Sequence, residues 1–392
     1  MAAGGSALAR DADGRVVFVD GALPGERVRA RITDARKDFA RAVTLEVLEA
    51  SPDRVAPPCP ALAAGCGGCT WQHVSGPAQP RLKADIVLDA LRRIAKLAEP
   101  PVPEPVAMAL DGEPLRTTAR LAVAAGGRAG HRPRSGSGAV ETDACLAAHP
   151  LLEELIVAGR YPGANEVLLR VAVATGERMV LVDRNAAGVQ VPAGVAVFEE
   201  GENRAAVVHE EVAGRRFRIS AGSFFQPGPV VAAALARAVS ASIGDTLVEG
   251  GLLVDLYAGV GLFASVLGAE RGVRVVTVES DRSAVADARV NLADLDAKVV
   301  AAEVGRWRPQ PAQVVVADPS RSGLGRPGVA AVAATGAPRV VLVSCDPASL
   351  ARDTVLLQAA GYALVSVALV DAFPHTFHVE TVSRFDRVVQ HL

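Results

Sequence analysis

The hydrophobic and polar positions of this chain follow three patterns in succession, and the first covers residues 1–52. Arg27, Arg29 and Arg31 alternate there with apolar residues, which is the period of two expected of a β-strand with one cationic and one apolar face. A second alternating run follows at 42–48. These runs predict a small β-barrel module, and its arginines form either a surface for an anionic partner or an ordinary solvated strand face.

The second pattern extends over residues 53–217 and begins with prolines and cysteines. Apolar residues recur at helical spacing within 81–97, which predicts an amphipathic helix. The proline-rich stretch at 100–106 is typical of a linker. Short alternating runs then predict a mostly antiparallel β domain, with strands at 121–124, 166–173, 178–182 and 215–219.

The third pattern covers residues 218–392, where short apolar runs alternate with stretches of helical periodicity. Continuous apolar runs are typical of strands that are buried on both faces of a parallel sheet. The alternation of strands and helices therefore predicts an α/β domain with a doubly wound, Rossmann-like sheet. Its predicted strands are 252–255, 273–278, 298–301, 313–317, 339–343 and 362–370.

Composition narrows the possible partners and the compartment. The 392 residues are 50% hydrophobic and carry a formal net charge of −2, so a nucleic-acid partner would have to be bound by local cationic patches. Residues 1–10 lack the apolar stretch of a secretory signal, and the most apolar stretch, 252–269, contains Asp255 and several glycines. We therefore expect a cytoplasmic protein without a membrane partner.

A glycine turn follows the first predicted strand of the α/β domain and opens a helix. It begins at Asp255 and contains Gly259 and Gly261, and Glu279 ends the next strand, where a carboxylate can accept hydrogen bonds from a ribose diol. The dinucleotide fingerprint would need a third glycine where Ala264 stands. An acidic turn also suits a cationic sulfonium better than a pyrophosphate, so the pattern favours S-adenosylmethionine over NAD.

Candidate chemistry lies at the ends of two later strands. Asp318 ends the fourth strand, next to the first strand in a doubly wound sheet, and Cys345 ends the fifth. A single cysteine can be an inert core residue, but at this edge it is placed to act as a nucleophile. The polar run at 371–380, which ends in Glu380, is hard to explain by structure alone in an otherwise apolar domain.

Four further cysteines have the spacing of a metal site. Cys59, Cys66 and Cys69 form a C-x6-C-x2-C pattern, and Cys145 follows much later. This spacing alone permits either a four-cysteine zinc site or a [4Fe–4S] cluster.

A run of cationic residues precedes the last of these cysteines. It holds no acidic residue between its first and last arginine, and it forms either a solvated hairpin or a phosphate-binding surface. Its members are Arg116, Arg120, Arg128, His131, Arg132 and Arg134.

Taken together, these motifs resemble the RNA 5-methyluridine (uracil-C5) methyltransferase family over essentially the whole chain, including a TRAM-like N-terminal module. The motifs that carry the resemblance are Phe224-Phe225-Gln226, Ser344-Cys345-Asp346-Pro347 and the run from Asp371 to Glu380. The resemblance implies a class I methyltransferase fold, a tRNA or large-subunit rRNA substrate, and a monomer.

The resemblance also implies a role for each motif residue. Cys345 would add to C6 of the uracil, and Glu380 would remove the proton from C5 after methylation. Family members with the four other cysteines carry a [4Fe–4S] cluster, with one residue fewer in the first gap, which leaves zinc as the alternative here. The residues implied to contact S-adenosylmethionine are Gln226, Tyr257, Glu279 and Asp318, together with the turn at Gly259 and Gly261.

Two other functions fit parts of the pattern. A cytosine-C5 RNA methyltransferase would also use cysteine addition, but the Glu380 motif and the cysteine cluster argue against it. A non-catalytic RNA-binding or assembly protein would not need Cys345, Glu380 and the glycine turn together.

Overall fold

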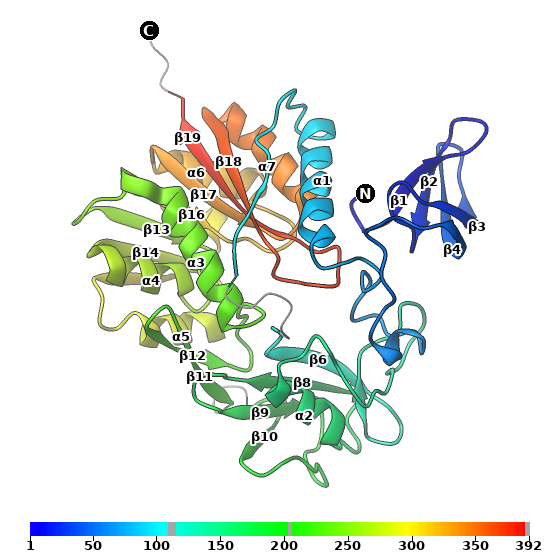
Figure 1. Ribbon diagram of the computed structural model, residues 1–392. Helices are drawn as coiled ribbons and strands as arrows, with labels where there is room; N and C mark the ends of the chain where they lie inside the picture. Colours follow the sequence, from blue (N-terminus) through cyan, green and yellow to red (C-terminus); the bar gives the residue numbers. More distant parts are fainter. Residues whose placement is uncertain (109–114, 203–205, 389–392) are drawn as a thin grey trace.

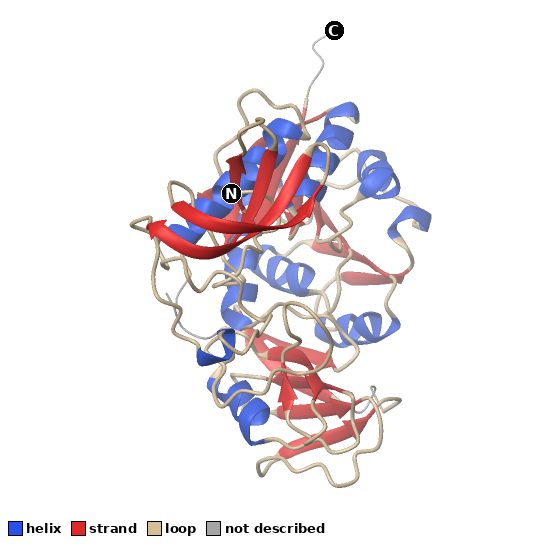
Figure 2. Cartoon of the chain, turned by 90° about the vertical axis from the view of Figure 1, so that its right-hand side faces the viewer, coloured by secondary structure: helices blue, strands red, loops and turns tan. Residues whose placement is uncertain are grey.

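A computed structural model describes residues 1–108, 115–202 and 206–388, and its parts follow one another along the chain as three sheet-containing regions (Figure 1). Viewed from its right-hand side, the molecule presents the N-terminal sheet in front of the α/β part, with the central sheet below (Figure 2). Within the described residues no helix is both long and apolar enough to cross a membrane.

The N-terminal region is a four-stranded sheet in the order β1-β2-β4-β3. Its strands are β1 (Ala7–Arg10), β2 (Val16–Asp20), β3 (Arg27–Ala35) and β4 (Phe39–Glu49). The alternation in β3 does form a strand, but its apolar positions are not a buried face, because Ile32 is 50% exposed. Arg27 and Arg29 pair across the strands with Glu49 and Glu46, each at 2.7 Å.

The central region contains a five-stranded sheet in the order β10-β9-β8-β6-β7 and a separate hairpin. Its elements are β6 (Thr118–Val123), β7 (Ala129–Gly130), α2 (Pro150–Ala158), β8 (Glu166–Val171), β9 (Arg178–Val182), β10 (Val195–Glu199), and the hairpin strands β11 (Val207–Val212) and β12 (Arg215–Ser220). The pairs within the sheet are antiparallel except β10 with β9. Phe217 and Ile219 of the hairpin are buried in the same core as Leu235, so the hairpin packs on the α/β region.

The α/β region is built on an eight-stranded sheet in the order β15-β14-β13-β16-β17-β19-β18-β5. Its elements are α1 (Ala78–Arg93), β5 (Glu104–Pro105), α3 (Pro229–Ile243), β13 (Leu252–Leu256), α4 (Leu262–Arg271), β14 (Arg274–Glu279), α5 (Arg282–Asn291), β15 (Ala297–Ala301), β16 (Val314–Ala317), α6 (Gly325–Ala334), β17 (Arg339–Ser344), α7 (Pro347–Ala359), β18 (Tyr362–Val370) and β19 (Glu380–Arg387). Short 3-10 helices cover Pro60–Leu62, Gly244–Thr246 and Val304–Arg306.

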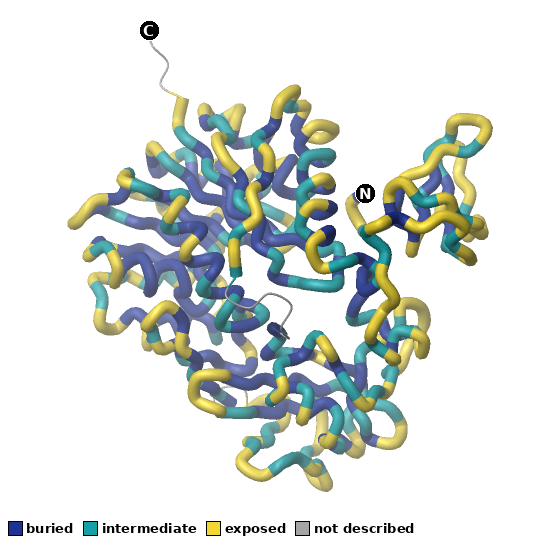
Figure 3. The backbone as a smooth tube through the Cα atoms, viewed as in Figure 1, coloured by how far each residue is buried: buried dark blue, intermediate teal, exposed yellow. Residues whose placement is uncertain are grey.

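Helices cover both faces of this sheet, and the burial colouring shows its interior as the darkest part of the chain (Figure 3). In β13, Leu253 packs in the core under α3 and α4, whereas Val254 packs in the core under α1, α6 and α7. Adjacent strand residues thus face opposite buried layers, which explains the continuous apolar runs in the sequence. The predicted doubly wound α/β fold, the N-terminal β module and the central β sheet are confirmed.

Two strands of this sheet were not predicted. β19 pairs antiparallel with both β17 and β18, and β5 lies within the stretch predicted to be a linker and pairs with β18 at the sheet edge. Prolines are tolerated there because an edge strand leaves one side of its backbone unpaired. The helix α1, which precedes β5 in the sequence, packs against α7 of the α/β region.

Candidate functional site

The predicted site residues gather at the carboxyl edge of the parallel strands. The chain runs from β13 outward through β14 to β15 and then returns to β16 on the other side of β13. Such a reversal leaves a crevice at the strand ends, where α/β proteins bind ligands. Tyr257, Glu279, Asp318 and Cys345 follow or end these strands, as predicted.

The glycine turn between β13 and α4 needs unusual backbone angles. Tyr257, Gly259 and Gly261 have φ of 58°, 55° and 86°. Glycine adopts this left-handed region freely, whereas a tyrosine there costs about 1–2 kcal/mol. The surrounding structure enforces this conformation at Tyr257, which also lines the pocket described below.

Asp255 differs from the role that the sequence indicated. Its side chain is fully buried, and Oδ2 accepts a hydrogen bond from the backbone N–H of Ala264 at 3.0 Å. Burial raises the pKa of Asp255 to about 8. The carboxyl group therefore stabilises the start of α4 and does not line the pocket, so it is not the acidic contact for a sulfonium that we expected.

A pocket opens beside the glycine turn. Gln226 Nε2 donates a hydrogen bond to Asp318 Oδ2 at 3.1 Å across it. Burial raises the pKa of Asp318 to about 7, and the hydrogen bond from Gln226 opposes this effect. The lining residues are Phe224, Phe225, Gln226, Tyr257, Ala258, Gly259, Val260, Leu262, Phe263 and Asp318.

Two predicted cofactor residues, Glu279 and Gly261, are not among the residues that line this pocket. Glu279 Oε2 accepts the backbone N–H of Gly259 at 2.9 Å, and Oε1 accepts those of Ser280 and Asp281. Gly261 is the N-cap residue of α4. Both residues therefore fix the turn that carries Gly259.

Cys345 and Glu380 come together through strand register. Ser344, the last residue of β17, lies opposite Thr381 of the neighbouring antiparallel β19. Cys345 directly follows Ser344 and Glu380 directly precedes Thr381, and the charge of Glu380 raises the pKa of Cys345, so the two side chains lie near each other. The structure thus brings the predicted nucleophile and the predicted base to the same end of the sheet.

The electrostatics of this pair are those of an enclosed anionic site. Burial raises the pKa of Cys345 to about 11, and the charges of Glu380 and Asp318 add to the effect. Burial and the charge of Asp318 also raise the pKa of Glu380 well above its ordinary value. A carboxylate with a raised pKa is a stronger proton acceptor, which suits a base.

Arg321 is a charged neighbour of this pair that the sequence did not indicate. Its positive charge lowers the pKa of both Cys345 and Glu380, opposing the effect of burial. The signal available in the sequence was its position three residues after Asp318, in the loop after β16.

A buried lysine supports the polar run before Glu380. Lys83 of α1 is fully buried, and its Nζ donates to Asp371 Oδ1 at 2.5 Å and to the Phe373 carbonyl at 2.9 Å. Gln79, also on α1, accepts the backbone N–H of His375 at 2.6 Å. No local pattern singles out Lys83, because its partner Asp371 stands 288 positions later in the chain.

The four other cysteines line one cavity. Cys59, Cys66 and Cys69 meet Cys145 there, and His131 Nε2 lies 3.9 Å from Cys145 Sγ. Within the described residues, no group of three or more His, Cys, Asp or Glu side chains is placed so that it could hold a metal ion. The cavity nevertheless presents four sulfur donors, which is the donor set of both candidate metal groups.

Three arginines of the cationic run at 116–134 pair with acidic residues outside it. Arg120 and Arg132 both pair with Glu166, at 2.7 and 3.0 Å, and Arg128 pairs with Asp143 at 2.6 Å. The absence of acids within the run therefore did not mean that its charges are unpaired.

Comparisons with known proteins extend this picture. The model of the TRAM domain family matches residues 3–45. A solved structure described as Pyrococcus abyssi tRNA (uracil-54, C5)-methyltransferase in complex with S-adenosyl-L-homocysteine superposes with a TM-score of 0.73 at 23% identity, covering 97% of this chain and 99% of that one. This likeness supports the fold.

Curated relatives match over almost the full length of the chain. An uncharacterized RNA methyltransferase of Streptomyces avermitilis is 35% identical, over 98% of this chain and 95% of the relative. The 23S rRNA (uracil(1939)-C(5))-methyltransferase RlmD of Alkalilimnicola ehrlichii is 34% identical, over 96% of this chain and 93% of the relative. With the fold and the strand-end residues described above, these matches show that the chain belongs to the family of S-adenosylmethionine-dependent RNA uracil-C5 methyltransferases.

Proposed function

We propose that the protein transfers a methyl group from S-adenosylmethionine to C5 of a uridine in RNA, through a covalent bond between Cys345 and C6 of the base. The observation that carries the proposal is the meeting of Cys345 and Glu380 at one sheet edge, in electrostatic contact with Asp318 of the pocket wall. The residues of that wall, Gln226 and Tyr257 among them, would hold the cofactor.

The proposed chemistry begins with Cys345. C5 of uracil is a poor nucleophile, and addition of the Cys345 thiolate to C6 gives an enolate whose C5 is nucleophilic. S-adenosylmethionine supplies an electrophilic methyl group on a sulfonium. Glu380 then accepts the C5 proton, the C5–C6 double bond re-forms, and the bond between Cys345 Sγ and C6 breaks. The target base has to leave its stack to reach Cys345.

Large-subunit rRNA is the substrate class that the relatives favour. The relative named for 23S rRNA is 34% identical, whereas the solved structure named for a tRNA is 23% identical. We therefore propose 23S-type rRNA ahead of tRNA.

The test is methyl transfer to RNA from a strain that lacks this protein. With isotopically labelled S-adenosylmethionine, the account predicts label in 5-methyluridine at one position of the large-subunit rRNA, located by nuclease digestion and mass spectrometry. Label at a tRNA uridine would correct the substrate class alone. Label in 5-methylcytidine, or no transfer to either RNA, would contradict the proposed reaction.

The four-cysteine cavity supports a second part of the proposal, a [4Fe–4S] cluster held by Cys59, Cys66, Cys69 and Cys145. Methyl transfer moves no net electrons, so the role of the cluster would be to stabilise the loops that its ligands join. Zinc remains the alternative group for four sulfur donors.

Protein purified without oxygen is expected to be brown and to contain about four iron atoms per chain, as a [4Fe–4S] cluster requires. Cys66→Ser and Cys145→Ser should each bleach the colour and lower the melting temperature, because each removes a ligand. Cys345→Ser is the matched control and should keep the iron. Stoichiometric zinc with no iron would favour the alternative metal.

A further inference from the structure

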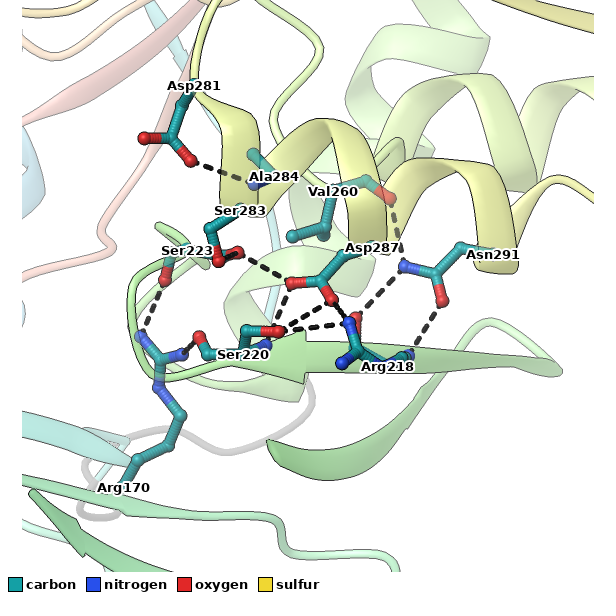
Figure 4. Close-up of polar contacts among 10 residues, drawn as sticks. All are labelled: Arg170, Arg218, Ser220, Ser223, Val260, Asp281, Ser283, Ala284, Asp287 and Asn291. Atoms are coloured by element: carbon teal, nitrogen blue, oxygen red, sulfur yellow. Dashed lines mark hydrogen bonds and ion pairs between the residues drawn. The ribbon is translucent and has the colours of Figure 1, made fainter. Parts of the chain in front are cut away.

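A buried polar network lies behind the cofactor pocket, on the face of α5 that is turned toward the hairpin strand β12 (Figure 4). Asp287 and Asn291 stand one helical turn apart on α5, and their exposed fractions are 0% and 5%. Burying a carboxylate is costly unless hydrogen bonds compensate it, so the partners of Asp287 indicate what the group is for.

Asp287 collects hydrogen bonds from the segment that leads to Gln226. Its Oδ2 accepts the backbone N–H of Ser220 at 2.8 Å and the hydroxyl of Ser223 at 2.6 Å. Its Oδ1 accepts the hydroxyl of Ser220 at 2.8 Å and pairs with the guanidinium of Arg218. Residues 221–226 belong to no helix or strand, so these side-chain bonds hold the chain just before the pocket wall.

Asn291 connects the same helix to the other pocket wall. Its Nδ2 donates to the carbonyl of Val260 in the glycine turn at 3.0 Å and to the carbonyl of Arg218 at 3.1 Å. Its Oδ1 accepts the backbone N–H of Arg218 at 2.7 Å. One face of α5 therefore fixes both the glycine turn and the strand that leads to Gln226.

Arg170 extends the network to the central sheet. This arginine of β8 is 5% exposed, and its guanidinium donates to the carbonyls of Ser220 at 2.6 Å and Ser223 at 2.9 Å. Asp287 and Arg170 thus hold the two ends of the Ser220–Ser223 turn from opposite sides. Three residues further on, Gln226 reaches Asp318 across the pocket.

We infer that Asp287 is a positioning residue for the cofactor: by fixing the turn at Ser220 and Ser223 it sets the place of Phe225 and Gln226 in the pocket wall. The inference rests on the proposed role of this pocket. Asp287 does not line the pocket itself, so its loss should weaken cofactor binding through Gln226 and leave the steps at Cys345 intact.

The test compares the affinity for S-adenosylhomocysteine, measured by calorimetric titration, in wild type, Asp287→Asn and Ser223→Ala. Bonds to a charged group contribute most, so Asp287→Asn should raise Kd by about tenfold or more. Ser223→Ala, which removes the contacts of the hydroxyl with Asp287 and Ser283, should raise it by about threefold. The KM for S-adenosylmethionine should rise in parallel, while kcat at saturating cofactor stays within about twofold of wild type.

Glu210→Gln is the matched control. Glu210 is also a buried carboxylate, 2% exposed, and accepts the backbone N–H groups of Val173 and Ala174 at 2.6 and 3.0 Å, away from the pocket. The Glu210→Gln substitution should lower the melting temperature of the protein without changing its Kd for S-adenosylhomocysteine. An unchanged Kd in Asp287→Asn, or an equal rise in Glu210→Gln, would overturn the inference. If Asp287→Asn does not fold, the Kd of Ser223→Ala is the test, and an unchanged value would overturn the inference. If the wild-type protein itself does not bind S-adenosylhomocysteine, the proposed role of the pocket is refuted instead.

Discussion

Replacing Cys345 with alanine is expected to abolish methyl transfer, with a loss on the order of 10⁴-fold or more, as for removal of a catalytic nucleophile elsewhere. Without the thiolate, C5 of uracil has no enolate character and does not attack a methyl sulfonium at a useful rate. The other four cysteines line a separate cavity and do not replace it. Initial rates with labelled S-adenosylmethionine and rRNA measure the loss.

Cofactor binding should survive the same substitution. The pocket wall is made by the segment at Gln226, the glycine turn and Asp318, and Cys345 is not among its lining residues. The affinity of Cys345→Ala for S-adenosylhomocysteine should therefore stay within about twofold of wild type, which is less than the effect of one lost hydrogen bond. Turnover close to wild type in a variant that binds the cofactor would contradict the proposed mechanism.

The parallel strands could be predicted because their short apolar runs in the sequence correspond to residues that are buried on both faces of the sheet. In β13 and β16, residues on both faces are apolar and buried, so short apolar runs marked them in the sequence. The site residues at their ends followed from the rule that ligands bind at the carboxyl edge of such a sheet.

The strand β19 could not be predicted because Thr381 and Asp386, two of its polar residues, find partners on another strand only in the folded chain. The Thr381 hydroxyl donates to the Ser344 carbonyl at 3.0 Å, and Asp386 accepts bonds from Arg339 and Arg384. Ser344 and Arg339 lie on the neighbouring strand β17, so these contacts leave no local pattern in the sequence, and the segment lacks the apolar run of a buried strand. Its first residue, Glu380, was found through its motif rather than through its strand.

The support of the site was the other part that pattern could not reveal. The ion pair between Lys83 and Asp371 and the hydrogen bond that the Ser223 hydroxyl donates to Asp287 each join residues more than sixty positions apart. The position of Asp255 before the glycine turn was predicted correctly, but the direction of its side chain was not. Its carboxyl group accepts a hydrogen bond at the start of α4 and does not line the pocket. Sequence spacing indicates which residues approach the site, whereas the direction of a side chain depends on its tertiary partners.

Glu380→Gln is expected to stop the reaction after methyl transfer and to trap the enzyme on its RNA. A glutamine occupies almost the same volume and cannot accept the C5 proton, so the elimination that frees Cys345 loses its base. Loss of a general base typically costs about 10²–10⁴ in rate. Addition of Cys345 should still proceed, since removing the negative charge of Glu380 lowers the pKa of the thiol. A role of Glu380 in packing alone predicts weaker binding or lower stability and no trapped species.

Mass spectrometry of that trapped complex tests the covalent mechanism most directly. Glu380→Gln protein is incubated with rRNA and with S-adenosylmethionine carrying a deuterated methyl group, then denatured and digested with nuclease and protease. The account predicts a peptide in which Cys345 carries one uridine nucleotide with the deuterated methyl group, and none in the double variant Cys345→Ala, Glu380→Gln. A folded, cofactor-binding Glu380→Gln protein that forms no such peptide, or an adduct on another cysteine, would contradict the account.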